Sequence, residues 1–227
     1  MMNVTREPRR RSLAHRRLTL GLQAVIAIGI VLEVFERQWL NVLITSSILL
    51  LTALPALMAR RFRVIIPTEF ELMTIAFIFA ALFLGETRDY YGRFWWWDLA
   101  LHGTSGGLLG ILGILLVYLL NENPRIDLQM QPGFVAFFAF CFSVAVGALW
   151  EIFEFGMDEL FGMNMQKAML DDPSGLTDTM WDLIVDSVGA GVVALLGYWT
   201  MKRGTQTMVE RWIRKFITSN PRLFTRR

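Results

Sequence analysis

Six long apolar runs constrain the fold of this chain more than any other feature of its sequence. They cover residues 18–35, 39–59, 64–85, 97–120, 133–155 and 179–201. Each is close to the ~20 residues that an α-helix needs to cross the hydrocarbon core of a bilayer, and none has the strict polar–apolar alternation of a barrel strand. With a hydrophobic content of 54%, the chain is too apolar for an ordinary water-soluble domain. The sequence therefore predicts an all-α, polytopic membrane protein: a bundle of six transmembrane helices.

The basic residues lie mostly on one side of the predicted membrane. Most of the 22 Lys and Arg residues come before the first run or after the second, fourth and sixth runs. Cytoplasmic loops of membrane proteins carry an excess of such residues. We therefore expect both termini to be cytoplasmic, with a basic tail over 1–17, a transmembrane domain over 18–203 and a second tail over 204–227.

The second tail contains an amphipathic helical pattern between residues 205 and 218. Its apolar residues recur on one helical stripe, and Arg211, Arg214 and Lys215 lie beside that stripe. Helices of this composition lie flat on anionic membrane surfaces. The pattern predicts a helix on the inner leaflet.

Glycines repeat at intervals of three or four residues in the fourth apolar run. The stretch 102–113 reads HGTSGGLLGILG, and the sixth run repeats the device with Gly189, Ala190, Gly191 and Gly197. Small residues at this spacing let two helix backbones approach closely. We expect a tight contact between the fourth and sixth helices.

Ionisable residues recur on the last three predicted helices, although each charged side chain at the centre of a bilayer costs at least ~2.5 kcal/mol. Their spacing of three or four places each series on one helical face, so the three faces can converge. The fourth helix carries Asp98 and His102, the fifth Glu151, Glu154 and Asp158, and the sixth Asp178, Asp182 and Asp186.

A rise of ~1.5 Å per residue sorts these groups by depth. Asp98, Asp158 and Asp178 form an outer level, His102, Glu154 and Asp182 a middle level, and Glu151 and Asp186 the deepest level. We predict that the six residues of the first two levels hold a cation, with Glu151 and Asp186 as catalytic residues, in the role of general base or support for the ligands. An imidazole with carboxylates suits Zn, Mn or Fe, and carboxylates alone suit Mg or Ca.

Two other interpretations of these acids stay open. Several of the carboxylates would carry protons if no metal compensates their charge. Asp98 and Asp178 also suit the first turn of a helix, where the helix dipole favours an acid.

Several of these motifs together resemble the YjdF-like family of bacterial inner-membrane proteins, over about residues 64–198. The matching segments are Gly85-Glu86, Tyr90-Tyr91, Trp97-Asp98, Leu101-His102, Trp150-Glu151-Ile152-Phe153-Glu154, Asp178-Thr179-Met180 and Asp182-Leu183. The final part is similar, more distantly, to the VanZ-like family associated with glycopeptide resistance, but it lacks the arginine expected between Glu154 and Asp182. The resemblance implies the helical architecture and a multi-pass location in the bacterial inner membrane.

Three functions are compatible with these features. The first is a divalent-metal enzyme at the outer leaflet that acts on a lipid or lipid-linked substrate. The second is a cation- or proton-coupled transporter, and the third is a non-catalytic accessory subunit that docks a partner through its glycine stripes. We expect membrane lipids as partners and no nucleic acid.

Overall fold

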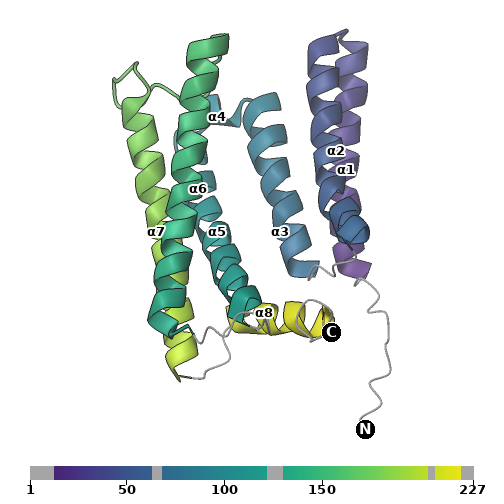
Figure 1. Ribbon diagram of the computed structural model, residues 1–227. Coiled ribbons are helices and arrows are strands. Elements are labelled where there is room, and N and C mark those ends of the chain that lie inside the picture. The colour runs from purple at the N-terminus through teal and green to yellow at the C-terminus, as the bar shows by residue number, and fades with distance from the viewer. Residues whose placement is uncertain (1–12, 63–67, 122–129, 204–207, 221–227) are drawn as a thin grey trace. The chain divides into compact units, whose positions relative to one another are not determined.

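The computed structural model describes residues 13–62, 68–121, 130–203 and 208–220, which are almost entirely helical (Figure 1). Six of its helical segments are long and apolar enough to cross a membrane. The predicted all-α, polytopic fold is therefore confirmed. Most of the predicted basic tail 1–17, and residues 204–207 and 221–227 of the second tail, lie outside the described residues.

The described residues divide into two compact units, Met1–Tyr90 and Tyr91–Arg227. The first contains α1 (Leu13–Phe35), α2 (Trp39–Phe62), α3 (Thr68–Ile78) and the π-helix η1 (Phe79–Thr87). Ile26, Ile48 and Phe83 form its buried apolar cluster. The third predicted helix, 64–85, is one helical span from Thr68 onward, with residues 64–67 outside the described part, and its last part is the wider π-helix.

The first unit also buries a carboxylate between α1 and α2. Glu33 is only 4% exposed, and its Oε1 accepts a hydrogen bond of 3.0 Å from the hydroxyl of Thr45. Nearer the start of α1, the Gln23 amide donates to the hydroxyl of Thr52 on α2 at 3.2 Å. These two hydrogen bonds satisfy part of the polar surface between the helices, whereas Oε2 of Glu33 has no hydrogen-bond partner among the described residues.

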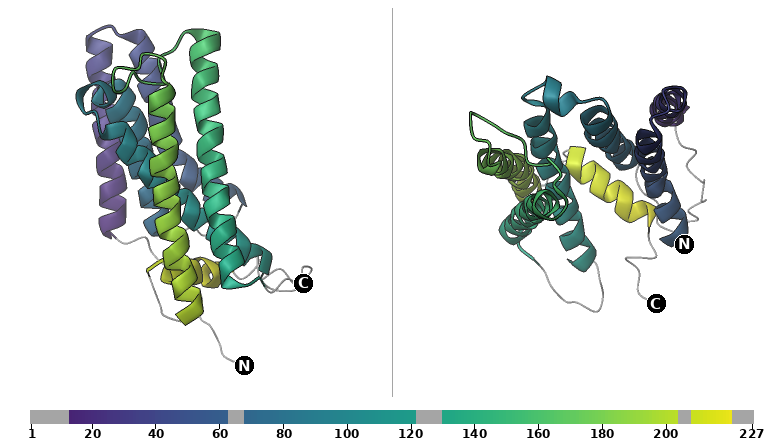
Figure 2. Two further views of the ribbon diagram at one scale, coloured as in Figure 1. Left: turned by 90° about the vertical axis from the view of Figure 1, so that its left-hand side faces the viewer. Right: turned by 90° about the horizontal axis from the view of Figure 1, so that it is seen from above.

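The second unit contains three long helices, α5 (Trp97–Asn121), α6 (Pro132–Phe161) and α7 (Leu176–Arg203), which all pack on one another (Figure 2). A short helix, α4 (Tyr90–Arg93), lies at the start of the unit. The final helix, α8 (Met208–Ser219), contacts α7 and runs crosswise to the long helices (Figures 1 and 2). Because α6 enters the bundle antiparallel to α5 and α7, its C-terminal end lies beside their N-terminal ends.

α6 continues beyond the end of the predicted apolar run. It runs to Phe161 and stops at Gly162, which adopts a left-handed conformation with φ of 62° and donates its N–H to the carbonyl of Asp158. A left-handed glycine is a common helix terminator. The acids Glu154 and Asp158 therefore both lie on helical backbone.

The glycines of α5 and α7 bring these two helices into backbone contact, as predicted. A methyl group placed on Gly189 would collide with the carbonyl oxygen of Gly103, and one placed on Gly106 would collide with the carbonyl oxygen of Asp186. On the neighbouring helix, the buried hydroxyl of Ser143 donates to the carbonyl of Gly106 at 2.8 Å. This close packing fixes the position of α5 relative to α6 and α7.

Candidate metal centre

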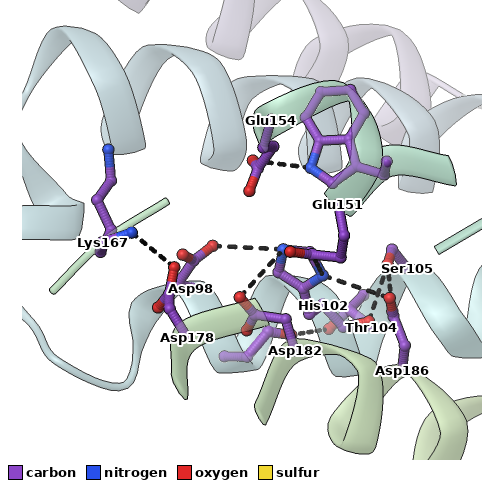
Figure 3. Close-up of polar contacts among 12 residues, drawn as sticks. Asp98, His102, Thr104, Ser105, Glu151, Glu154, Lys167, Asp178, Asp182 and Asp186 are labelled. Carbon is purple, nitrogen blue, oxygen red and sulfur yellow. Dashed lines mark hydrogen bonds and ion pairs between the residues drawn. The ribbon is translucent and has the colours of Figure 1, made fainter. Parts of the chain in front are cut away.

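His102 is the centre of the polar cluster in the second unit, and four carboxylates surround its ring (Figure 3). Its Nε2 lies 3.6 Å from Oδ1 of Asp98 and 3.8 Å from Oδ2 of Asp182. Its Nδ1 lies 3.3 Å from Oδ2 of Asp186 and 3.7 Å from Oε1 of Glu151. The three helices thus bring together five of the eight predicted site residues around one imidazole.

The cluster is buried inside the unit. His102 is 7% exposed, Glu151 is 4% exposed, and Asp182 and Asp186 are 0% and 1% exposed. Asp98 is the most accessible member, with 16% of its side chain exposed. A single imidazole carries at most one positive charge, so it cannot neutralise four ionised carboxylates. Buried charges need partners of opposite charge, and the arrangement therefore favours either a bound cation or protonated acids.

Asp182 accepts no hydrogen bond from the described residues. It lies one turn after Asp178 on α7, and neither of its oxygens has a hydrogen-bond partner there, a property that it shares with Glu151 on α6. A buried carboxylate oxygen without a donor costs more free energy than one left in water. At this position Asp182 therefore requires either a bound cation or a proton of its own.

Asp186 differs from Asp182 because both of its oxygens are engaged. The hydroxyl of Ser105 shares its proton between Oδ1 and the backbone carbonyl of His102, each at 2.8 Å, and Nδ1 of His102 lies within hydrogen-bond distance of Oδ2 at 3.3 Å. Sequence reasoning missed Ser105, although it lies three residues after His102 and therefore on the same side of α5. Asp186 thus joins α7 to two side chains of α5.

Glu154 lies outside this ring, although the depth ordering placed it level with His102. Its Oε1 accepts a 2.9 Å hydrogen bond from the indole N–H of Trp150 (Figure 3). The rise along a helix sets depth, whereas rotation about the helix axis decides which side chain faces a neighbour. Glu151, three residues earlier, is the glutamate of α6 that reaches the imidazole.

Asp158 and Asp178 accept hydrogen bonds from the backbone of the loop 162–175. Asp158 receives the N–H groups of Met165 and Gln166 at 2.7 and 2.9 Å, and Asp178 receives the N–H of Lys167 at 2.7 Å. Through these contacts both acids attach the loop 162–175 to the ends of α6 and α7. Their role as metal ligands stays a prediction.

Asp172 organises the same loop just before α7 begins. Its oxygens accept hydrogen bonds from the hydroxyl and N–H of Ser174 and from the N–H and hydroxyl of Thr177. Four donors on one carboxylate stabilise its charged form, and they hold the pKa of Asp172 well below its ordinary value. Asp172 therefore stabilises the first turn of α7, which leads to Asp178 and Asp182.

Three residues of the cluster have the geometry of a metal-binding group. Asp98, His102 and Asp182 each offer one ligand atom, and these atoms lie within 4.8 Å of one another. One imidazole nitrogen and two carboxylate oxygens are a ligand set that suits Zn, Mn or Fe. All three belong to the six residues that the sequence analysis predicts as ligands, and the role of Glu154 as a ligand stays a prediction.

Comparison with known proteins identifies the family of the chain. The model of the family described as "Predicted membrane protein (DUF2238)" matches residues 18–203, which include all six apolar runs. The chain belongs to this family. The YjdF-like proteins that the sequence resembles belong to the DUF2238 family as well, so that resemblance is confirmed.

A relative from Thermotoga maritima, described as an uncharacterized protein, is 31% identical over 134 residues. The alignment covers 59% of this chain and 64% of the relative. No solved structure matches the chain. Membership of the DUF2238 family therefore establishes a membrane protein, and the chemistry of the site has to be argued from its own residues.

Proposed function

We propose that this DUF2238 protein is a divalent-metal-dependent enzyme whose metal is held by Asp98, His102 and Asp182. The observation that carries the proposal is Asp182, which is fully buried and without a hydrogen-bond partner among the described residues, yet lies in the ligand group with the other two. A divalent cation would compensate two of the buried negative charges and would supply the missing partner of Asp182. It would also explain why acids from α5, α6 and α7 converge on one histidine.

The ligand set favours a catalytic over a purely structural centre. Structural zinc sites close their coordination with four protein ligands, whereas catalytic sites use three and keep a position open. Asp98, His102 and Asp182 supply three. A metal bound there would act as a Lewis acid on an ester or phosphoryl oxygen, or would lower the pKa of water.

Glu151 is the best candidate for a general base. It is 4% exposed, and its Oε1 lies 3.7 Å from His102 Nδ1. A carboxylate beside the centre, and outside the ligand group, can accept a proton from a reacting water. The predicted catalytic role of Glu151 is therefore retained in the proposal.

The substrate that fits this location is a lipid or a lipid-linked molecule. All three ligands lie on helices that are long and apolar enough to span the membrane. Exposed aromatic side chains of Phe94, Trp95 and Trp96 directly precede the helix that carries Asp98 and His102. Aromatic residues of this kind gather at the level of lipid headgroups, so a headgroup could reach the half-buried Asp98 first.

Metal analysis tests the binding step of the proposal. Purified protein, stripped with a chelator and then dialysed against Zn²⁺ or Mn²⁺, should retain about one equivalent of metal. The variants Asp182→Asn and His102→Ala should retain none, whereas Glu159→Gln, which changes an exposed acid of α6, should bind like wild type. Equal metal content in wild type and Asp182→Asn would contradict the proposal.

Two assays in liposomes separate an enzyme from a transporter. An enzyme should produce a metal-dependent change in a lipid extract, detected by mass spectrometry, that is lost in Glu151→Gln while metal binding persists. A transporter should instead show a flux of ⁶⁵Zn²⁺ or ⁵⁴Mn²⁺ that Asp182→Asn abolishes. A metal-ion flux without any lipid product would contradict the proposed enzyme and favour the transporter.

A further inference from the structure

Asp186 is held in a fixed position by the two helices that face it. It is 1% exposed, and the hydroxyl of Ser105 on α5 donates to its Oδ1 at 2.8 Å. Its other oxygen, Oδ2, points toward His102 Nδ1 at 3.3 Å (Figure 3). Each carboxylate oxygen therefore has one defined neighbour on α5.

Gly147 on α6 makes room for the carboxylate of Asp186 because it has no side chain. A methyl group placed on Gly147 would lie 2.5 Å from Oδ2 and 3.2 Å from Cγ of Asp186. Contacts of that length between carbon and oxygen are repulsive, so any larger residue at this position would displace the carboxylate. Gly147 and Ser105 thus constrain the Asp186 carboxylate from two sides, and this sets the position of Oδ2 beside the imidazole.

This contact decides which nitrogen of His102 carries the proton. An ionised carboxylate only accepts hydrogen bonds, so the ring nitrogen that faces it must be the donor. In the neutral ring the proton is then on Nδ1, and the lone pair is on Nε2. Nε2 is the nitrogen that lies 3.6 Å from Asp98 and 3.8 Å from Asp182.

We infer that Asp186 is a positioning residue that holds His102 in the Nδ1–H tautomer and so directs Nε2 toward the metal ligands Asp98 and Asp182. Metal-bound histidines commonly donate their second N–H to a carboxylate, which fixes the ring and raises its basicity. The inference rests on the proposed metal site and refines it, because it assigns the ligand atom and separates Asp186 from Glu151. Glu151 Oε1, at 3.7 Å from the same nitrogen, is too distant to replace it.

Nitrogen NMR of the metal-free protein, recorded at a pH high enough for the ring to be neutral, tests the tautomer directly. The sequence has two histidines, and His15→Gln leaves His102 as the sole ¹⁵N-histidine signal. Wild-type His102 should show a protonated Nδ1 and an unprotonated Nε2. Gly147→Ala and Ser105→Ala should each mix the two tautomers, whereas Gly156→Ala, whose added methyl group would contact nothing within 4 Å, should not. A wild-type ring protonated on Nε2 would overturn the inference.

Titration with Zn²⁺ or Mn²⁺ supplies a second readout. Loss of an outer partner of a metal-bound histidine weakens binding by about 10–100-fold. Gly147→Ala and Ser105→Ala should show that loss at unchanged stoichiometry, and Ser105→Ala keeps the test valid if the glycine variant fails to fold. Wild-type affinity in Ser105→Ala would overturn the positioning role. Absence of metal binding in wild type would refute the proposed function, and the NMR result would still decide the tautomer.

Discussion

The two units of the chain bury carboxylates in different ways. In the first unit Glu33 stands alone, and one oxygen accepts a hydrogen bond from Thr45. In the second unit four acids surround His102, and Asp182 has no hydrogen-bond partner among the described residues. The hydroxyl of Thr45 satisfies only one oxygen of Glu33, since Oε2 has no hydrogen-bond partner among the described residues, whereas the four convergent acids in addition repel one another unless a cation or protons compensate their charge. The first unit therefore buries one acid within a helix contact, whereas the second gathers several acids in a group that offers three ligand atoms to a cation.

The largest expected effect is a metal-dependent stabilisation confined to the second unit. At a free Zn²⁺ or Mn²⁺ concentration of about 1,000 times the Kd, binding should add about 4.1 kcal/mol to the free energy of opening. Hydrogen exchange followed by mass spectrometry should show this protection in peptides of α5, α6 and α7. Glu33→Gln should leave the protection intact and Asp182→Asn should abolish it. Equal protection of α1 and α2 would remove the distinction between the units.

The second prediction concerns the backbone contact that holds the cluster together. Gly189→Ala should destabilise the second unit by about 3 kcal/mol, because the new methyl group would meet the carbonyl of Gly103 and overpacking at rigid positions typically costs 1–3 kcal/mol. Gly191→Ala on the same helix is the matched control, since its methyl group would lie 3.9 Å from the ring of Phe140. Thermal unfolding in detergent, followed by tryptophan fluorescence, measures both variants. Similar unfolding temperatures for the two would show that α5 and α7 can separate without cost.

The third prediction tests the hydrogen-bonded pair of the first unit. Thr45→Val should cost about 1–3 kcal/mol, because it leaves the buried Glu33 carboxylate without its donor. The double variant Glu33→Leu with Thr45→Val should recover most of that loss, since it removes both polar groups. Thr104→Val, at an exposed position where the hydroxyl bonds only to the carbonyl of Ala100, is the control. If the double variant is less stable than Thr45→Val alone, the Glu33 carboxylate must stabilise the first unit through contacts other than the hydrogen bond from Thr45.

The architecture could be predicted from the sequence because it depends on properties that sequence records directly. Six apolar runs fixed the number of spans, and glycine spacing indicated the contact between α5 and α7. The convergence of acids from three helices followed from their spacing of three and four residues. Membership of the DUF2238 family agrees with this architecture.

The detailed composition of the site depends on rotations that spacing does not record. Depth placed Glu154 beside His102, whereas the structure pairs Glu154 with Trp150 and turns Glu151 toward the imidazole. The sequence did not indicate the contacts of Ser105 and Gly147 with Asp186, because a serine and a glycine are common in transmembrane helices rich in small residues. Glu33 lies near the end of its apolar run, and its burial against Thr45 depends on the packing of α1 on α2, which spacing along one helix does not record. Side-chain direction and helix rotation therefore account for most of what sequence reasoning missed.

The smallest expected effect distinguishes the loop acid Asp172 from the buried acids. The hydrogen bonds from Ser174 and Thr177 lower the pKa of Asp172 in the folded state. Its contribution to stability is therefore fully present above its unfolded pKa of about 3.9, and it is lost as the pH falls from that value toward the lower folded pKa. The difference in unfolding temperature between wild type and Asp172→Asn should accordingly be constant from pH 7 to 5 and shrink below pH 4. Asp171→Asn, at the neighbouring exposed position, should show no comparable change. A difference for Asp172→Asn that stays the same down to pH 3 would mean that the Asn side chain replaces the charged acceptor fully, and that shape rather than charge holds the start of α7.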